Sequence, residues 1–303
     1  MELEKETTHC VAKNYKHIKM IIVRLRGGLG NQMFQYAAGR QLSIKHNVPL
    51  KFDLSLLNVE STTCTKRYFE LDKFNISIEF ASEKEVKVIR KQRWKNILTP
   101  TWLKERENDC YNQFRRAGKN CCLDGYFQSE KYFINVSEQI RSELTFKDAL
   151  IGSDWVEVKK QIEDSNSISL HFRRGDYVEN PNTNKFHGVC SMDYYQNAVK
   201  AIVEKVENPH FFIFSDDIRW VIENFKVNYP TVFVEKKDED LHSDFQLMSH
   251  CKHHIIANSS YSWWAAWLSN NKGKIIIVPE KWFADTEKQN KAIDLLPSKW
   301  IKL

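Results

Sequence analysis

Ser167-Ile168-Ser169-Leu170-His171-Phe172-Arg173-Arg174-Gly175-Asp176 is the stretch with the clearest structural signal in this chain of 303 residues. Its first six residues alternate strictly between polar and apolar side chains, which predicts a β-strand. Two arginines follow at the strand's end, where burying two cations without an anion would be costly. We therefore expect Arg173 and Arg174 to clamp a diphosphate, with Asp176 holding one guanidinium in place. A purely structural ion-pair cluster is the alternative.

The same rhythm of short strands and amphipathic helices continues to the C-terminus. Ser191 is expected to cap a helix, and Ser243 to open another through a capping box. Strands are expected at 167–172, 211–214, 232–234, 255–257 and 275–278, with helices between them at 191–206, around 220–222, from 243 onward and at 262–268. Strands that alternate with helices in this way indicate a parallel, doubly wound sheet.

The N-terminal half begins with the same pattern and then becomes less regular. Strands are expected at 21–25, 49–53 and 123–128, a tight turn at 27–30, and helices at 32–46 and 136–144. The chain is therefore predicted to be α/β, with two Rossmann-like domains, 20–155 and 156–303, facing each other across a cleft. Because ligands of such sheets bind beyond the carboxyl ends of the strands, one cleft would hold both 27–32 and 171–176.

Composition and charge narrow the classes of function. The net charge of +6 suits an anionic ligand, whereas a nucleic-acid-binding domain would show a basic stripe. Seven irregularly spaced cysteines argue against a disulfide framework and for a reducing, cytoplasmic location. Residues 1–19 contain no apolar run, so we expect a tail that is neither a signal peptide nor a membrane anchor.

A glycine-rich loop, Gly27-Gly28-Leu29-Gly30, follows the first expected strand. Glycines there let the backbone approach a ligand and direct amides toward an anion. A dinucleotide fingerprint would add Asp53 as the ribose ligand, but Met33 stands where the third glycine belongs. Binding of a nicotinamide cofactor, as in an oxidoreductase, is therefore a weaker interpretation of this loop than a ligand-facing loop. A plain tight turn without a ligand is a further alternative.

Two further strand ends carry polar residues. Asn258, Ser259 and Ser260 precede a helix and predict a second anion-binding corner, with an ordinary N-cap as the alternative. Asp216 and Asp217 follow the strand at 211–214 and are candidates for guanine or ribose recognition.

Metal sites are not expected. The cluster of His250, Cys251, His253 and His254 lacks a complementary second cluster. The segment Asp238-Glu239-Asp240 matches a metal-binding D-x-D literally, but a solvated turn explains it equally well.

Five segments together resemble glycosyltransferase family 11, the α-1,2-fucosyltransferases, particularly the bacterial members. They are residues 24–37, 124–129, 171–177, 214–217 and 257–264. The segment 171–177 contains the family's H-x-R-R-x-D motif, matched in full at His171, Arg173, Arg174 and Asp176. Five such segments in one order are far more specific than any one of them.

The resemblance implies a GT-B-like fold and inverting transfer of L-fucose from GDP-fucose to the 2-hydroxyl of a galactose residue, without cofactor or obligatory metal. It implies that Arg173 contacts the donor diphosphate and that Asn31 lies near the reacting centre. A galactose-terminated oligosaccharide would be the acceptor, and a lipid-linked acceptor would bring the enzyme to a membrane surface. The expected GDP-fucose-binding residues are Gly28, Gly30, His171, Arg173, Arg174, Asp216, Asp217, Asn258, Ser259 and Ser260.

The proton acceptor is left open by the sequence. Inverting transfer needs a group that takes the proton of the attacking hydroxyl. Asp176, Asp53 and Asp124 are candidates, and Asn31 could orient the hydroxyl without a strong base. Arg173, Asn31 and Asp176 are the expected catalytic residues. A module that binds a nucleotide sugar without catalysis remains a further alternative.

Overall fold

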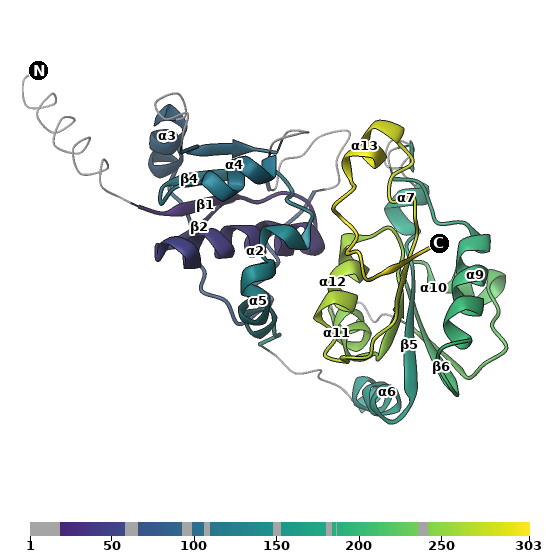
Figure 1. The fold of residues 1–303 in the computed structure, drawn as a ribbon. Helices are drawn as coiled ribbons and strands as arrows, with labels where there is room; N and C mark the ends of the chain where they lie inside the picture. The colour runs from purple at the N-terminus through teal and green to yellow at the C-terminus, as the bar shows by residue number, and fades with distance from the viewer. Residues whose placement is uncertain are drawn as a thin grey trace, which may run out of the picture. The chain divides into compact units, whose positions relative to one another are not determined.

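The computed structural model describes residues 19–57, 66–92, 99–105, 110–147, 153–179, 184–185, 187–235 and 242–303. The chain divides into a first unit that ends at Thr145 and a second that begins at Phe146 (Figure 1). The sequence placed this boundary ten residues later, at 155/156. The difference arises because helix α6 (Ser153–Asp164) buries Trp155 and Ile162 and packs against β5 and α11 of the second unit.

The first unit contains a four-stranded parallel sheet in the order β2-β1-β4-β3. Buried residues of β1 lie at its centre, with Ile21 paired to Leu50 on one side and to Cys121 on the other. The strands are β1 (Ile21–Arg24), β2 (Leu50–Asp53), β3 (Trp102–Lys104) and β4 (Cys121–Asp124), and the helices are α2 (Leu29–His46), α3 (Glu83–Gln92), α4 (Cys110–Arg116) and α5 (Ser137–Glu143). Short 3-10 turns span Leu71–Lys73, Glu130–Tyr132 and Ile134–Val136.

Two predicted elements of the first unit have different bounds. Helix α2 begins at Leu29, three residues before the predicted start, so Gly30 and Asn31 belong to its first turn and not to a loop. Strand β4 ends at Asp124, four residues early, because Phe127 has a positive φ of 52° that no strand accommodates.

The second unit contains a six-stranded parallel sheet in the order β10-β9-β8-β5-β6-β7. Its central strand is β5 (Asn166–Phe172), the strand on which the prediction was based. The others are β6 (Pro209–Ser215), β7 (Thr231–Val234), β8 (His253–Ile255), β9 (Ile276–Val278) and β10 (Ile301–Lys302). The helices after β5 are α7 (Gly175–Glu179), α9 (Met192–Val203), α10 (Ile218–Asn224), α11 (Ser243–His250), α12 (Ser260–Leu268) and α13 (Thr286–Lys291). The prediction of two Rossmann-like α/β domains with parallel sheets is confirmed.

The two helix starts that the sequence singled out have different outcomes. Ser191 caps α9, since its hydroxyl accepts the N–H of Tyr194 at 3.1 Å. The capping box at Ser243 is wrong, because Ser243 is already the first helical residue and His242, which precedes it, makes no side-chain cap.

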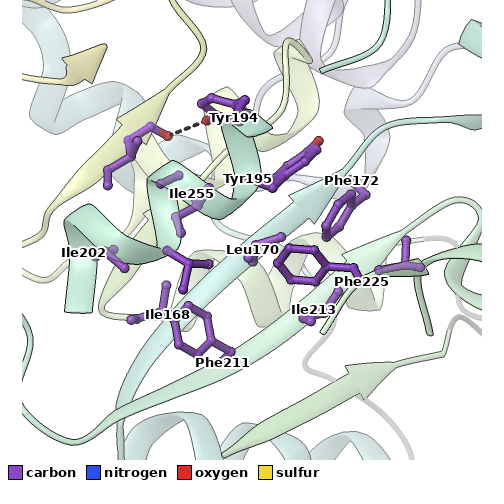
Figure 2. Close-up of a cluster of buried hydrophobic side chains, with 14 of the residues drawn as sticks. Ile168, Leu170, Phe172, Tyr194, Tyr195, Ile202, Phe211, Ile213, Phe225 and Ile255 are labelled. Carbon is purple, nitrogen blue, oxygen red and sulfur yellow. Dashed lines mark hydrogen bonds between the residues drawn. The ribbon is translucent and has the colours of Figure 1, made fainter. Parts of the chain in front are cut away.

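The main core of the second unit lies between β5 and the helices α9 and α10. Figure 2 shows the β5 side chains Ile168, Leu170 and Phe172 among side chains of α9 and β6 and beside Phe225, which follows α10. Figure 1 shows α11 and α12 on the other side of the sheet. Because both faces are covered, the polar positions of β5 are buried as well, namely Ser167, Ser169 and His171. Within the described residues, no helix combines the length and the apolar character needed to span a bilayer.

Candidate active site

The two arginines after β5 are held by two aspartates after β6. The strands pair in parallel, with Phe172 beside Ser215, so their carboxyl ends lie side by side. Nη1 of Arg173 lies 2.7 Å from Oδ2 of Asp216. The backbone N–H of Arg174 donates to the other oxygen of the same carboxylate at 2.8 Å, and Nε of Arg174 donates to Oδ2 of Asp217 at 3.1 Å.

An aromatic ring completes the fixation of Arg174. Its guanidinium carbon lies 3.4 Å from the centroid of the Trp220 ring, a stacking contact that favours a planar cation. Asp217 also caps α10, because its carboxylate accepts the backbone N–H of Trp220 at 3.4 Å. The same carboxylate therefore binds Arg174 and holds the start of the helix that carries Trp220. Nη1 and Nη2 of Arg174 make no hydrogen bond to the residues that the structure describes, and they remain available to an anion.

This arrangement adds partners that the sequence did not assign to the arginines. Asp216 and Asp217 pair with them, because parallel pairing of β5 and β6 brings the four residues to the same edge of the sheet. The sequence expected Asp176 to hold an arginine. The backbone of Asp176 lies in α7, and its side chain is outside the described part of the chain. Gly175 is needed for this contact, since a Cβ there would lie 2.6 Å from Oδ2 of Asp216.

His171 lies in β5, two residues before Arg173, and is buried. Burial, and secondarily the charge of Arg173, lowers its pKa from 6.5 to about 3. Its Nδ1 has no hydrogen-bond partner among the described residues. His171 is therefore neutral at physiological pH and supplies no positive charge to an anion.

The turn before α12 has a strong structural role. Nδ2 of Asn258 donates to the carbonyls of His187, Gly188 and Trp282 at 3.0 to 3.2 Å, which ties three loop positions together. Ser259 is the N-cap of α12 and accepts the N–H of Tyr261 at 3.3 Å, while Ser260 is the first helical residue. The N–H of Tyr261 in the first turn of α12 is thus taken by Ser259, and the side chains of Asn258 and Ser259 are engaged as well.

The glycine-rich loop of the first unit is organised around Asn31. Gly27 has a φ of 77°, and a Cβ there would lie 2.5 Å from Nδ2 of Asn31. Gly28 is the N-cap residue of α2. Oδ1 of Asn31 accepts a hydrogen bond from Nε2 of Gln128 at 2.7 Å, so the segment after β4 fixes this side chain.

Two buried glutamines of α2, one turn apart, were missed by the sequence reasoning. Gln32 donates to the carbonyls of Gly27 and Tyr68 and accepts the N–H of Glu70. Gln35 accepts the N–H of Arg26 and donates to the carbonyl of Gly125. Buried amides that are hydrogen-bonded in this way specify one arrangement of the loops that they join. Their only signal in the sequence is their position in a helix directly after the loop.

The carboxyl ends of β1, β2 and β4 carry a second set of ion pairs. Nε of Arg24 donates to Asp53 at 2.9 Å, Nη1 to Asp124 at 3.2 Å and Nη2 to Ser55 at 3.2 Å. Arg26 pairs with the other oxygen of Asp124. The remaining oxygen of Asp53 accepts the N–H of Ser55 at 2.9 Å. Both oxygens of each aspartate are thus occupied.

Two surface hollows lie elsewhere, and neither is lined by the candidate site residues described above. One of about 460 Å³ lies between α2 and the start of α5, and one of about 610 Å³ lies at the amino ends of β5 and β6. Among the residues that the structure describes, no three potential metal ligands come together. Asp238, Glu239 and Asp240 lie outside those residues.

Comparison with known proteins gives consistent results over nearly the whole chain. The family model for glycosyl transferase family 11 matches residues 3–303. An alpha-1,2-colitosyltransferase of Escherichia coli is 36% identical over 299 residues, which cover 94% of this chain and 99% of that protein. The O-antigen biosynthesis glycosyltransferase WbnK of Escherichia coli is 38% identical over 306 residues, which cover 92% and 99%.

More distant similarities cover less or are weaker. The galactoside alpha-(1,2)-fucosyltransferase 1 of Rattus norvegicus is 28% identical over 185 residues, which cover 58% of this chain and 47% of the rat protein. The crystal structure of NodZ alpha-1,6-fucosyltransferase soaked with GDP-fucose aligns with a TM-score of 0.44 and 13% identity, over 83% of this chain and 92% of that one.

Proposed function

Since the chain belongs to glycosyl transferase family 11, we propose that it transfers L-fucose from GDP-fucose, with inversion, to the 2-hydroxyl of a galactose residue. Membership over residues 3–303 overturns the oxidoreductase alternative, and it makes the chain a glycosyltransferase. The α-1,2 linkage is supported by the names of the colitosyltransferase and of the rat fucosyltransferase. The observation that carries the proposal is the arginine pair held by Asp216 and Asp217.

The arginine pair suits the departure of a nucleoside diphosphate. Glycosyl transfer passes through an oxocarbenium-like state while negative charge grows on the leaving group. Preorganised donors aimed at developing charge supply the largest catalytic effect in many enzymes. Arg174 meets this requirement, because Asp217 and Trp220 fix its guanidinium and Nη1 and Nη2 are available. We assign to Arg173 and Arg174 the stabilisation of the departing diphosphate.

The contacts of the other carboxylates reduce the number of candidates for the proton acceptor. Asp53 and Asp124 already accept two hydrogen bonds or ion pairs each, so neither suits an attacking hydroxyl. Oδ1 of Asn31 is likewise occupied by Gln128. Asp176 is the candidate that these contacts leave, and Asp176→Asn should then lower kcat with little change in the KM of GDP-fucose.

The identity of the transferred sugar, fucose or colitose, needs a test of its own. One relative is named for colitose, which lacks the 3-hydroxyl that fucose carries. A site built to hydrogen-bond a hydroxyl discriminates strongly against an analogue without it, whereas an apolar site discriminates weakly. Comparing kcat/KM for GDP-fucose and for the same diphosphate carrying colitose decides between the two donors. A higher value for the colitose donor would contradict fucose transfer.

The arginines also bear on metal dependence. We propose that they replace the divalent cation that D-x-D transferases use, so the reaction needs no metal or other cofactor. EDTA should leave the rate unchanged, and inhibition by EDTA that manganese reverses would contradict this mechanism.

The decisive experiment is a GDP-release assay with GDP-fucose and a panel of β-galactosides. Release that depends on the galactoside supports the transferase, while binding of GDP-fucose without release for any acceptor supports a non-catalytic module. An acceptor carried on a lipid fits the O-antigen role in the name of one relative, and it would place a cytoplasmic enzyme at the membrane surface. Comparing free with lipid-linked galactosides in the same assay tests that location.

A further inference from the structure

The turn that follows β4 exposes an aromatic ring on an unusual backbone. Phe127 has a positive φ of 52° and is fully buried, whereas the preceding Tyr126 is 41% exposed. A left-handed conformation is unfavourable for a bulky residue and persists only where the surroundings impose it. Such conformations cluster at functional sites. The turn therefore directs Tyr126 outward at the carboxyl edge of the first unit's sheet.

Three contacts impose this conformation. The carboxylate of Glu105 accepts the N–H of Tyr126 at 2.6 Å and the N–H of Phe127 at 3.0 Å. Nε2 of Gln35 donates to the carbonyl of Gly125 at 3.1 Å. A side chain on Gly125 would collide with Glu105, because its Cβ would lie 2.4 Å from that of Glu105. The position of Tyr126 is therefore set before any ligand binds.

The groups around Tyr126 suit a neutral polyhydroxylated ligand. The guanidinium of Arg26 lies over its ring, 5.7 Å from the centroid, and pairs with Asp124. All three nitrogens of the neighbouring Arg24 already make a hydrogen bond, to Asp53, Asp124 and Ser55, so this side chain is committed to contacts within the unit. In the second unit, by contrast, Arg174 keeps two nitrogens available. An aromatic face takes the C–H face of a pyranose, and ionised groups beside it take the hydroxyls.

We propose that Tyr126 is the stacking platform for the acceptor sugar and that Arg26 binds its hydroxyls with the N–H groups that the pair with Asp124 does not use. The proposal rests on the function above, since it assigns the site of the galactose that receives the transferred sugar. It makes Glu105 and Gln35 positioning residues, which act through the backbone of the turn. The ligand class is a neutral hexopyranoside.

The test separates binding of the acceptor from catalysis. Tyr126→Ala should raise the KM of a methyl β-galactoside about tenfold with kcat within about twofold, because a stacking contact binds ground state and transition state alike. Tyr126→Phe keeps the ring and should stay near the wild type. The control is Tyr229→Ala in the second unit, since Tyr229 is exposed to the same degree, 40%. Hydrolysis of GDP-fucose without acceptor should be unchanged in all three variants.

A binding measurement keeps this test distinct from the test of the proposed function. Saturation-transfer NMR should show methyl β-galactoside binding to the wild type and to Tyr229→Ala, and weaker binding to Tyr126→Ala. An unchanged galactoside KM and unchanged NMR binding in Tyr126→Ala would overturn the platform. Failure of the wild type to turn over any galactoside would overturn the proposed function, while loss of NMR binding in Tyr126→Ala would still support the platform.

Discussion

Nη1 of Arg173 and Oδ2 of Asp216 form an ion pair at 2.7 Å across two adjacent strands of the second unit. The other oxygen of this carboxylate accepts the backbone N–H of Arg174. One side chain from the end of β6 therefore fixes both arginines at the end of β5. The proposed function therefore predicts that Asp216 acts on the donor diphosphate through the arginines, whereas the sequence suggested direct recognition of guanine or ribose.

Asp216→Ala should weaken the binding of GDP and of inorganic pyrophosphate by the same factor, about tenfold or more. Loss of a charge-assisted hydrogen bond network costs about 1.5–3 kcal/mol, and both ligands share the diphosphate. Isothermal titration calorimetry with each ligand measures the two affinities. Weaker binding of GDP with unchanged pyrophosphate binding would favour contact between Asp216 and the nucleoside.

Arg174→Lys should lower kcat/KM for GDP-fucose about tenfold to a hundredfold. Lysine keeps the charge but loses the planar fork that Asp217 and the Trp220 ring hold in place, and it cannot bind a diphosphate bidentately. The matched control is Arg219→Lys, on the exposed side of α10. A rate for Arg174→Lys equal to that of the control would show that charge alone suffices and that the observed orientation is irrelevant.

The sequence predicted β5 and its arginines well because the signal is local. Strict alternation over 167–172 fixes the strand, and residues that follow a strand lie at the sheet edge. The partners of the arginines could not be predicted in this way. Asp216 and Asp217 were recognised as polar residues after a strand, but their pairing with Arg173 and Arg174 depends on the neighbouring positions of β5 and β6. That relationship is tertiary, and 42 residues separate Arg174 from Asp216.

The first unit shows the opposite case. Strand β3 has three residues, too few for any periodicity to emerge, and it was missed. Gln32 and Gln35 were missed because glutamine in a helix is typical of a solvated face, whereas here both are buried. The strand predicted through Gln128 ended early because the contacts of Glu105 and Gln35 bend the chain at Gly125. These contacts join segments far apart in sequence, so local patterns carry no trace of them.

Gln35→Met should lower the free energy of unfolding by about 2 kcal/mol. Methionine fills a similar volume, but it leaves the N–H of Arg26 and the carbonyl of Gly125 without the amide that satisfies them, and each lost partner costs about 1–3 kcal/mol. Chemical denaturation measures the loss, and Gln196→Met on the exposed face of α9 is the control. Because Gln35 also fixes the turn that carries Tyr126, the KM of the galactoside should rise as well, while stability and KM equal to the control would contradict this role.

Acid should destabilise the second unit through His171. Its pKa is about 3 in the folded chain and near 6.5 when unfolded, so between these values the unfolded chain binds the additional proton. The stabilisation is therefore complete above about pH 6.5 and is lost progressively as the pH falls toward 3. From pH 8 to pH 5 the contribution lost is about 2 kcal/mol, and burial of His254, whose pKa is also lowered, adds in the same direction. In His171→Asn, which does not titrate, the decrease in unfolding free energy between pH 8 and pH 5 should be smaller by about that amount. Equal decreases in the two proteins, measured by denaturant titration at each pH, would show that His171 can take up its proton without unfolding.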